Sequence, residues 1–380
     1  MTETEAARRI GVLTTGRQDW GILRTACIAI DACPELDLEL IVGGMHLDPT
    51  FGHTVDEVRA DGFTPSREVA WDPGRPAWEQ LATVAHGVGV ALADGRPDAL
   101  LLVGDRFETA AAALAATTVA VPIAHLHGGE ETQGAFDDQL RHAITKLSHL
   151  HLVASDAAAA RVVALGEDPR AIRLVGPPGT DAAFRDDLPD RAELEASLGV
   201  DLRPPVVLVS VHPTTLATDP TADARTVASA LDAVDATYVI SLPNADPGGE
   251  AVRSTLRSAA AHDPRRVAVE ALGQRRHWGL LRLADALVGN SSSGIIEAPL
   301  VGLPVVNVGD RQRGRERWGP VVDVEAEGRA IAAALAAALR DGRHGPAERP
   351  LVDGHAGERV ALALAGWHPT RPPRKPPISG

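Results

Sequence analysis

Short apolar runs that alternate with longer helical stretches are the feature that most restricts the fold of this chain. A break rich in Pro and Gly, G-P-P-G-T-D at residues 176–181, separates one series of such runs from another. Strands that alternate with helices favour parallel sheets with helical cover. We therefore predict the α/β class, with two Rossmann-like domains facing a central cleft. The strand-like runs of the first series are residues 9–15, 37–43, 98–103, 121–126 and 149–154, and those of the second are 205–211, 236–242, 266–270, 284–289 and 304–308.

The break also sets the predicted domain boundaries. Residues 1–180 form the N-terminal domain and residues 181–368 form the C-terminal domain. The end of the chain, 369–380, is rich in Pro and basic residues and is predicted to be disordered. Helical patterns are clearest in residues 78–93, 107–119 and 325–340.

The composition restricts the class of protein further. The 380 residues are 44% apolar and 23% charged, as in globular proteins, and the net charge of −14 argues against a general binder of nucleic acids or membranes. No apolar run is long enough to cross a bilayer, and the first residues do not have the pattern of a secretory signal. The two cysteines, Cys27 and Cys33, need not pair. We expect a reduced, cytoplasmic protein.

Residues that cofactor chemistry would need are scarce. Lysine occurs only at Lys146 and Lys375, and since Lys375 lies in the Pro-rich tail, only Lys146 could form a Schiff base. The single tyrosine, Tyr238, has no lysine four residues later, so a Tyr-x-x-x-Lys pair for nicotinamide chemistry cannot form. No G-x-G-x-x-G follows the first predicted strand, whose turn reads T-T-G-R-Q-D-W-G. We therefore expect no bound cofactor.

Polar side chains gather where the predicted strands end. Ligands of parallel α/β sheets bind at the carboxyl ends of the strands, so this repeated position indicates a site lined by carboxylates, imidazoles and guanidiniums. The candidates are Arg17, Asp19, His46, Asp105, Arg106, His127, Glu130, Asp137, Asp138 and Arg141 in the first domain, and His212, Asn244, Ser291, Ser292, Glu297 and Arg311 in the second.

Each candidate also has a purely structural interpretation. Asp105 could cap the helix that follows it. Arg141 and His142 lie at i,i+3 and i,i+4 spacings from residues 137–138 and could form surface ion pairs, and the alternate arginines of 311–317 could form a solvated edge. Taken singly, these interpretations are preferred. Taken together, the positions favour a site.

Two histidines on one strand raise the question of a metal. His125 and His127 point the same way on a strand, as metal ligands often do. No third ligand has a convincing spacing, and a nearby carboxylate could instead orient either ring. We predict no metal.

The segment G-N-S-S-S-G-I-I-E-A-P, residues 289–299, directly follows a predicted buried strand. Ser and Asn are good helix N-caps, so a strand, a capped turn and a helix would explain it. Hydroxyl and N–H donors at the N-terminus of a helix are equally suited to bind an anion. The segment alone is compatible with both interpretations.

An ordered set of stretches carries a resemblance to a known family. They are T-T-G-R-Q-D-W-G-I-L-R, G-M-H-L-D-x-x-F-G-x-T, V-G-D-R-F-E, H-L-H-G-G-E, D-D-Q-L-R-H-A-I-T-K-L-S-H-L-H, V-G-N-S-S-S-G-I-I-E-A-P and G-D-R-Q-R-G-R. These stretches resemble the UDP-N-acetylglucosamine 2-epimerase family, and most of all its hydrolysing, sialic-acid-pathway branch. The resemblance runs from about residue 9 to 320 and implies a GT-B fold, with UDP bound mainly by the second domain and the sugar in the cleft.

The resemblance implies a nucleotide site built largely by the second domain. Ser291 and Ser292 match the segment that binds the diphosphate, and Glu297 matches a glutamate that accepts the ribose hydroxyls. Guanidinium suits phosphate because its donors form a planar fork. The other positions that match groups near the nucleotide are Arg17, Arg311, Asn244 and the loop 272–279.

The family's reaction explains the need for carboxylates. The C2 hydrogen of a 2-acetamido sugar is removed while UDP leaves C1, which gives a 2-acetamidoglucal. C2 is then protonated from the opposite face, so acid/base groups are needed on both sides of the ring. The resemblance implies Asp105 and Asp137 as first choices, with Glu130 and His212 next. The groups expected to orient the sugar or the acid/base groups are Asp19, His46, Asp138, Arg106 and Arg141.

One position departs from the family pattern. Some relatives have a catalytic glutamate where this chain has His127, so either His127 or Glu130 is expected to take an acid/base role. The first loop, R-Q-D-W-G, lacks the lysine of the non-hydrolysing branch. This favours hydrolysis, with N-acetylmannosamine and UDP as products.

Other functions stay open at this stage. A non-hydrolysing epimerase would give UDP-N-acetylmannosamine, a GT-B glycosyltransferase would use a UDP-sugar donor, and a silent binder would hold the UDP-sugar without turnover. A modified substrate such as a 2,4-diacetamido sugar is also compatible. The expected partners are the UDP-sugar and further copies of the chain, in a homodimer or homotetramer.

Overall fold

A computed structural model describes residues 6–72, 74–131, 137–214, 217–244, 248–370 and 372–375. The chain divides into two compact units. The first unit comprises residues 1–130, 137–184 and 350–380, and the second comprises residues 131–136 and 185–349, each as far as it is described.

The first unit contains a parallel sheet with the strand order β3-β2-β1-β4-β5-β6-β7. Its central strands are almost continuously apolar because helices cover both faces of the sheet. In β4, for example, every residue of A-L-L-L-V is buried. The strands are β1 (Arg8–Thr14), β2 (Leu36–Gly43), β3 (Arg67–Val69), β4 (Ala99–Val103), β5 (Ile123–Leu126), β6 (Leu150–Val153) and β7 (Ile172–Leu174).

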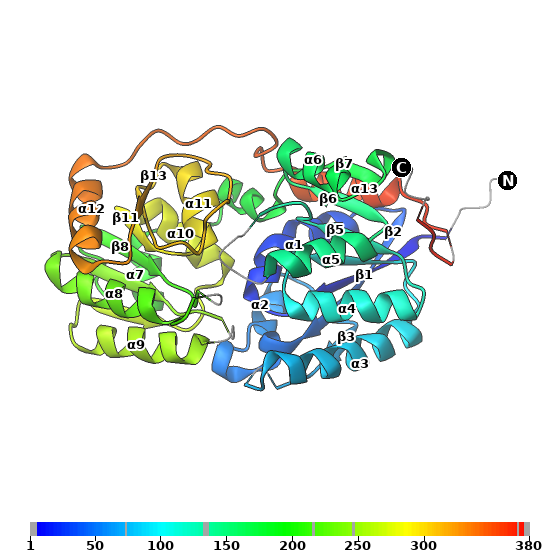
Figure 1. Cartoon of the computed structure of the whole chain (residues 1–380), viewed down its shortest axis with the longest axis horizontal. Helices are drawn as coiled ribbons and strands as arrows, with labels where there is room; N and C mark the ends of the chain where they lie inside the picture. Colours follow the sequence, from blue (N-terminus) through cyan, green and yellow to red (C-terminus); the bar gives the residue numbers. More distant parts are fainter. Residues whose placement is uncertain are drawn as a thin grey trace. The chain divides into compact units, whose positions relative to one another are not determined.

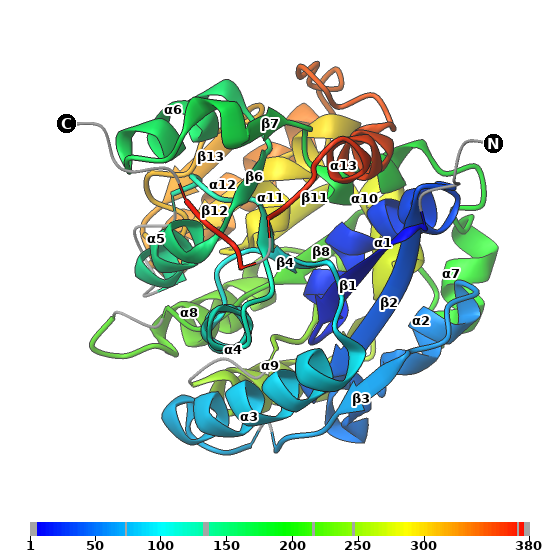
Figure 2. The same ribbon diagram turned by 90° about the vertical axis from the view of Figure 1, so that its right-hand side faces the viewer.

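Helices cover the two faces of this sheet in two layers (Figure 2). One core joins the sheet to α1, α2 and α13, and the other joins it to α3, α4 and one face of α5. The helices are α1 (Arg17–Asp31), α2 (Val55–Ala60), α3 (Ala77–Gly95), α4 (Phe107–Thr118), α5 (Asp137–Leu147), α6 (Asp156–Ala164) and α13 (Ala356–Ala365). Short 3-10 helices are η1 (Gly44–Leu47), η2 (Pro49–Phe51), η3 (Pro169–Ala171) and η4 (Pro178–Phe184).

The C-terminal helix α13 belongs to the first unit, where it packs against α1 (Figure 1). Asp181 accepts hydrogen bonds from the backbone N–H groups of Ala356 and Gly357, at 3.1 and 2.8 Å, and so caps the helix. The predicted second domain, residues 181–368, is therefore too long at its C-terminal end, since the second unit ends at Arg349. A shift in composition along the sequence indicates where a linker lies. It does not indicate into which of the two units a later helix such as α13 packs.

The tail that follows α13 was predicted to be disordered. Residue 371 and residues 376–380 lie outside the described part of the chain. Within residues 372–375, the ammonium group of Lys375 lies 2.6 Å from a carboxylate oxygen of Glu167. Lys146 lies 2.6 Å from the other oxygen of the same carboxylate, so both lysines of the chain converge on one buried acid.

The second unit contains a parallel sheet with the order β10-β9-β8-β11-β12-β13. The strands are β8 (Val206–Ser210), β9 (Thr237–Ser241), β10 (Arg266–Val269), β11 (Ala286–Gly289), β12 (Val305–Val308) and β13 (Val321–Val324). The helices are α7 (Arg191–Leu198), α8 (Ala222–Ala230), α9 (Gly249–Ala261), α10 (Gly273–Leu283), α11 (Ser292–Ile296) and α12 (Gly328–Asp341), with 3-10 helices η5 (Leu231–Ala233) and η6 (Ala298–Val301). The fold class predicted from the alternating pattern, two parallel α/β sheets, is confirmed.

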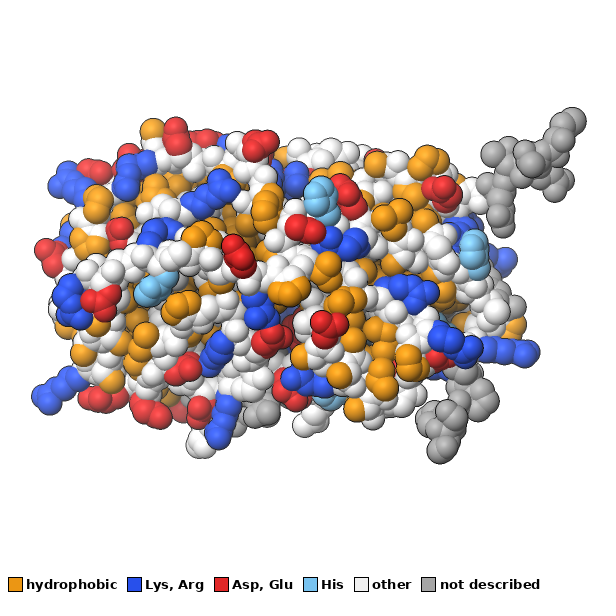
Figure 3. Space-filling view, turned by 90° about the horizontal axis from the view of Figure 1, so that it is seen from above, with side chains coloured by type: hydrophobic (Ala, Val, Ile, Leu, Met, Phe, Trp, Pro, Cys, Tyr) orange, Lys and Arg blue, Asp and Glu red, His pale blue; other side chains and the backbone are white. Residues whose placement is uncertain are grey.

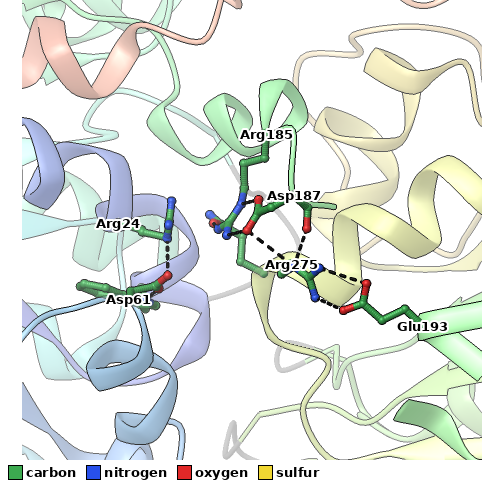
Figure 4. A network of polar contacts seen from close by, with 8 residues as sticks. Arg24, Asp61, Arg185, Asp187, Glu193 and Arg275 are labelled. Atoms are coloured by element: carbon green, nitrogen blue, oxygen red, sulfur yellow. Dashed lines mark hydrogen bonds and ion pairs between the residues drawn. The ribbon is translucent and has the colours of Figure 1, made fainter. Parts of the chain in front are cut away.

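Ion pairs fix several helices within each unit (Figure 4). In the first unit, the side chain of Arg24 on α1 lies 2.8 Å from Asp61, directly after α2. In the second unit, Arg275 on α10 pairs with Glu193 on α7 and lies 3.6 Å from Asp187. These pairs join the start of α10 to α7 and to the segment before α7.

Charge is mixed over the surface that Figure 3 shows, where acidic and basic side chains lie interspersed among apolar ones. No helix in the described ranges is both long and apolar enough to span a membrane.

Candidate active site

The first unit places most of its predicted site residues where β1, β4 and β5 end and where α5 begins. Arg17 is the first residue of α1, directly after the loop that ends β1. Asp105 and Arg106 lie between β4 and α4, and His127 follows β5. Asp137 is the first residue of α5, and the residues just before it, 132–136, lie outside the described part of the chain.

Arg141 organises one group of these residues. Its side chain is only 3% exposed and contacts a carboxylate oxygen of Asp105. The same guanidinium lies 3.5 Å from Asp138, and His142 lies 3.6 Å from the other oxygen of Asp138. A protonated Asp105 would lose its ion pair with a buried guanidinium, so Asp105 is better placed to hold charge than to exchange protons.

His127 and Glu130 form a second group, in the turn H-G-G-E. Nδ1 of His127 lies 2.5 Å from Oε1 of Glu130. Nε2 of His127 is buried and has no hydrogen-bond partner among the described residues. A carboxylate that holds one ring nitrogen fixes the tautomer and leaves the other nitrogen for proton transfer.

The backbone of this turn is unusual in the way active-site loops often are. His127 has a φ of +66°, which few non-glycine residues adopt. Gly129 has a φ of +78°, and a Cβ there would lie 2.3 Å from the carbonyl oxygen of Ala158. Gly129 therefore lets the chain turn tightly between His127 and Glu130, where a side chain would not fit.

Asp19 is buried behind the loop that follows β1. The N–H and the hydroxyl of Thr15 both donate to its Oδ2 atom, at 2.8 and 2.6 Å. Burial raises the pKa of Asp19 to about 6, although the charge of Arg106 opposes the rise. Arg106 itself is held by Glu108, with its Nη2 atom 2.9 Å from Oε1. These residues form a cluster that can orient a bound group.

His46 and His125 have both ring nitrogens occupied. In His46, Nε2 contacts the hydroxyl of Thr14 and Nδ1 that of Thr54, each at 2.8 Å. In His125, Nε2 lies 2.7 Å from the carbonyl oxygen of Gly104. Burial lowers the pKa of each to about 3, so both rings are neutral. Their geometry favours support of neighbouring loops over contact with a ligand.

In the second unit, the serine segment begins a short helix after β11. Ser291 is the N-cap of α11, and its hydroxyl accepts a hydrogen bond from the N–H of Ser293 at 3.3 Å. Ser292 is the first helical residue. The cap therefore exists. The N–H groups of Ser293 and Gly294 are bonded to the hydroxyl and the carbonyl oxygen of Ser291, at 3.3 and 3.1 Å, so the Ser292 N–H and the serine hydroxyls are the donors that could bind an anion at this strand end.

Asn290 ties the neighbouring loops to this segment. Its side chain accepts from the N–H of His212 at 2.7 Å and donates to the carbonyl of His212 at 2.9 Å. Arg311 and Gln312 donate to the carbonyl oxygen of Asn290 at 3.2 and 2.8 Å. Asp223 accepts from the Asn290 amide at 3.0 Å. Sequence reasoning did not select Asn290, Asp223 or Gln312, and only the position of Asn290 at a strand end could have indicated a role.

Glu297 and His277 form a pair beside the serine segment. Nε2 of His277 on α10 lies 2.9 Å from Oε2 of Glu297 and 2.9 Å from the hydroxyl of Ser293. Burial raises the pKa of Glu297, but the donors His277 and Ser293 outweigh burial and leave this pKa below its ordinary value. His277 lies in the segment 272–279, which was expected to form a loop near the nucleotide and instead forms the start of α10 (Gly273–Leu283); His277 was not selected by itself. Asn244 is the last described residue before residues 245–247.

Neither a metal-binding group nor the cavity of the first unit adds to this site. In the described part of the chain, no group of three or more His, Cys, Asp or Glu side chains could hold a metal ion. A cavity of about 620 Å³ in the first unit lies between α1, α13 and the turn at residues 33–35, and none of the predicted site residues lines it.

The two parallel α/β sheets, and polar side chains that gather at the carboxyl ends of their strands, define a GT-B protein. The profile of a family described as UDP-N-acetylglucosamine 2-epimerase matches residues 28–365. The chain belongs to the UDP-N-acetylglucosamine 2-epimerase family.

Individual relatives agree with this membership. The chain is 35% identical to a UDP-N,N'-diacetylbacillosamine 2-epimerase (hydrolyzing) from Legionella pneumophila, with 87% of this chain and 89% of the relative covered. It is 31% identical to a GDP/UDP-N,N'-diacetylbacillosamine 2-epimerase (hydrolyzing) from Campylobacter jejuni, with 84% of each covered. The fold is similar to the crystal structure of UDP-GlcNAc 2-epimerase from Neisseria meningitidis bound to UDP-GlcNAc, with a TM-score of 0.78, 16% identity, and 94% and 99% of the two chains covered.

Proposed function

We propose that the protein is a hydrolysing 2-epimerase that acts on a UDP-linked 2-acetamido sugar. The observation that supports this most directly is the likeness, at 35% and 31% identity over most of the chain, to two relatives named as hydrolysing 2-epimerases. The proposed reaction converts UDP-N-acetylglucosamine and water to N-acetylmannosamine and UDP. UDP-N,N'-diacetylbacillosamine, the sugar in the names of both relatives, is the second substrate to test.

His127 is the proposed acid/base group on one face of the sugar. Its Nδ1 atom is held by Glu130 at 2.5 Å, so the ring is oriented and its Nε2 atom is the one left for proton transfer. Glu130 is then a positioning residue. We choose His127 over Glu130 as the acid/base group because Oε1 of Glu130 already contacts Nδ1 of His127, whereas Nε2 of His127 has no hydrogen-bond partner among the described residues.

Asp137 is the proposed acid/base group on the opposite face. Asp105, the other first choice, is engaged with the buried guanidinium of Arg141 and is proposed to fix that guanidinium beside the substrate. Asp138 and the cluster of Asp19 with Arg106 are proposed to orient the sugar. The two proton transfers then use groups of different chemistry, an imidazole and a carboxylate.

The second unit is proposed to bind UDP. Ser291 and Ser292 offer N–H and hydroxyl donors to the diphosphate at the start of α11, and Arg311 and His212 lie on loops tied to the same segment. Donors placed here stabilise the charge that grows on UDP as the bond to C1 breaks.

The proposed reaction proceeds in two balanced halves. In the first, one group takes the proton from C2, the electron pair forms the C1–C2 double bond, and UDP leaves with the electrons of the C1–O bond. In the second, the opposite group gives a proton to C2, water adds at C1 and its proton passes to that group, while the first group releases the proton of C2 to solvent. The products are the free 2-epimeric sugar and UDP.

A proton NMR time course with UDP-N-acetylglucosamine in deuterated water tests the proposal. Free N-acetylmannosamine with deuterium at C2, together with UDP, is the expected result. UDP-sugars deuterated at C2 without release would instead identify a non-hydrolysing epimerase. An unchanged spectrum with both UDP-sugars, followed by turnover on addition of a sugar acceptor, would identify a glycosyltransferase. Tight UDP binding with no turnover at all would identify a silent binder.

Location and assembly belong to the proposal as well. We propose a cytoplasmic protein, because both cysteines are free, Cys27 being fully buried and Cys33 partly exposed. We also propose that it assembles as a homodimer or homotetramer. Size-exclusion chromatography with light scattering tests the assembly, and a monomer at micromolar concentration would contradict it.

A further inference from the structure

We infer that His277 is a positioning residue that holds the carboxylate of Glu297 so that it selects ribonucleotides by their ribose hydroxyls. This inference rests on the proposed function, because it takes the second unit as the UDP site. The starting observation is the close contact of His277 Nε2 with Glu297 Oε2, at 2.9 Å.

The direction of this hydrogen bond follows from the chemistry of the two groups. An ionised carboxylate only accepts hydrogen bonds, so Nε2 of His277 must carry the proton that points to Glu297. The pKa of Glu297 is below its ordinary value despite burial, because His277 and Ser293 donate to it. The carboxylate is therefore held in the charged form that accepts hydroxyl donors.

The carboxylate keeps capacity for a ligand after this contact. A carboxylate has two oxygens and about four lone-pair sites, and His277, on Oε2, and Ser293 together use two of them. A vicinal diol presents two hydroxyl donors side by side, a pattern that fits a carboxylate. The side chains of Glu297 and His277 are 25% and 22% exposed, so the pair is accessible and not sealed in the core.

The position of His277 is fixed by its helix before any ligand binds. The next residue, Trp278, is 1% exposed and anchors α10 in the core. Arg275 ties the same turn of α10 to Glu193 on α7 (Figure 4). Arg276 donates to the carbonyl oxygens of Ala271 and Leu272, at 2.8 and 2.7 Å, and closes the turn that starts the helix. A side chain held on such a framework can pre-organise its partner.

A role in helix packing alone is the competing interpretation, since the contact also joins α10 to α11. The two interpretations differ in what they predict for ligands that lack one hydroxyl. A packing contact would change the affinity for every nucleotide equally, whereas a positioning residue would change the discrimination between UDP and its deoxy analogues.

The test is a titration of the full-length protein by calorimetry with UDP, 2'-deoxy-UDP and 3'-deoxy-UDP. For the natural protein we expect UDP to bind more tightly than at least one deoxy analogue, by about 10-fold, since a hydroxyl bonded to a charged group is lost. In His277→Leu the UDP affinity should fall by about 3- to 10-fold and the discrimination should shrink towards none. In His277→Gln, whose amide can replace the Nε2 donor, discrimination should be retained.

Two further variants make the result specific. His262→Leu removes an exposed histidine that directly follows α9 in the same unit, and it should leave UDP affinity and discrimination unchanged. In a Glu297→Gln background, His277→Leu should have little further effect, because His277 acts through Glu297.

Three other outcomes would contradict the inference, and each would contradict a different part of it. Equal discrimination in the natural protein and His277→Leu would overturn the positioning role and leave the UDP site standing. No discrimination in the natural protein would remove Glu297 from ribose recognition. No UDP binding at all would overturn the proposed function together with the inference.

Discussion

At the scale of single residues, His127 is the position where this chain can be tested most sharply. His127→Asn keeps a side chain that tolerates the φ of +66°, since Asn adopts left-handed backbone readily, but it lacks an atom at Nε2. Loss of an acid/base group should slow C2–H exchange by about 10²–10⁴-fold. Exchange in deuterated water measures this rate, and calorimetry should show unchanged UDP affinity.

Glu130→Gln is the matched variant for this prediction. It removes the charge that fixes the imidazole but leaves Nε2 in place, so the rate should fall less and its pH profile should shift. Exchange that is as fast in His127→Asn as in the natural protein would assign the chemistry to carboxylates alone. If Glu130→Gln slowed C2–H exchange more than His127→Asn, Glu130 would be the acid/base group and His127 the positioning residue.

Asp19 makes a second prediction at this scale, for stability against pH. Its pKa is raised from 3.8 to about 6 by burial, so the folded chain still holds a proton that the unfolded chain has already lost. The free energy of unfolding should therefore fall as the pH rises through this window, by about 3 kcal/mol from this group. Asp19→Asn should remove this dependence, because an amide does not titrate. Its Oδ1 atom can still accept from Thr15, so the local structure should be kept.

Urea unfolding at a series of pH values checks this. The difference in unfolding free energy between Asp19→Asn and the natural protein should grow from about pH 4 to about pH 6 and then level off. Asp37→Asn, an exposed position on β2, serves as the control and should track the natural protein. A constant difference for Asp19→Asn would mean that Asp19 is ionised throughout.

At the scale of elements, the contact of α13 with α1 depends on one glycine. A Cβ at Gly357 would lie 2.5 Å from the carbonyl carbon of Thr25, and backbone cannot yield as a flexible side chain does. Gly357→Ala should therefore destabilise the protein by about 1–3 kcal/mol or more. Gly328→Ala, at the start of α12 where no atom lies within 4 Å, should change stability by less than about 1 kcal/mol.

Thermal unfolding of the two variants measures the contrast. Equal melting temperatures for Gly357→Ala and Gly328→Ala would mean that α13 can move away from α1 without loss. A lower melting temperature for Gly357→Ala alone would confirm that the close approach holds the two helices together.

The central elements could be predicted from the sequence because a buried parallel strand is apolar along its whole length. Every predicted strand has a counterpart, such as residues 98–103 for β4 (Ala99–Val103). The strands that the sequence did not reveal are β3, β7 and β13, which lie at sheet edges. Edge strands are short and half exposed, so R-E-V or I-R-L carries no continuous apolar signal.

The location of the candidate site could be predicted from the sequence, but the contacts between its side chains could be predicted less well. Strand-end residues such as Asp105 and His127 could be selected because polar groups after a buried strand are conspicuous. Their partnerships could not, because the contact of Arg141 with Asp105 spans different elements. His277 carried no signal of its own, since a histidine on a helix is uninformative until its neighbour Glu297 is known.

At the scale of the whole molecule, the chain leaves the first unit after Phe184 and returns to it at Pro350. The unit is therefore not complete until the last part of the chain has been made. Val360 and Leu364 of α13 are fully buried in the core that also contains residues of α1. A chain that lacks this segment must leave the matching face of α1 exposed to water.

Two truncations test this topology. A chain that ends at residue 349 loses α13, and the burial of Val360 and Leu364 alone stabilises by about 3–6 kcal/mol. This is a large part of the 5–15 kcal/mol by which proteins are usually stable, so the first unit should fail to fold and the protein should aggregate. A chain that ends at residue 371 keeps α13 but loses residues 372–380, among them Lys375 with its contact to Glu167, while Lys146 still contacts Glu167 at 2.6 Å. Its melting temperature should fall by a few degrees at most. Circular dichroism and size-exclusion chromatography compare the two chains, and a stable, monodisperse chain that ends at residue 349 would show that α13 is dispensable for the first unit.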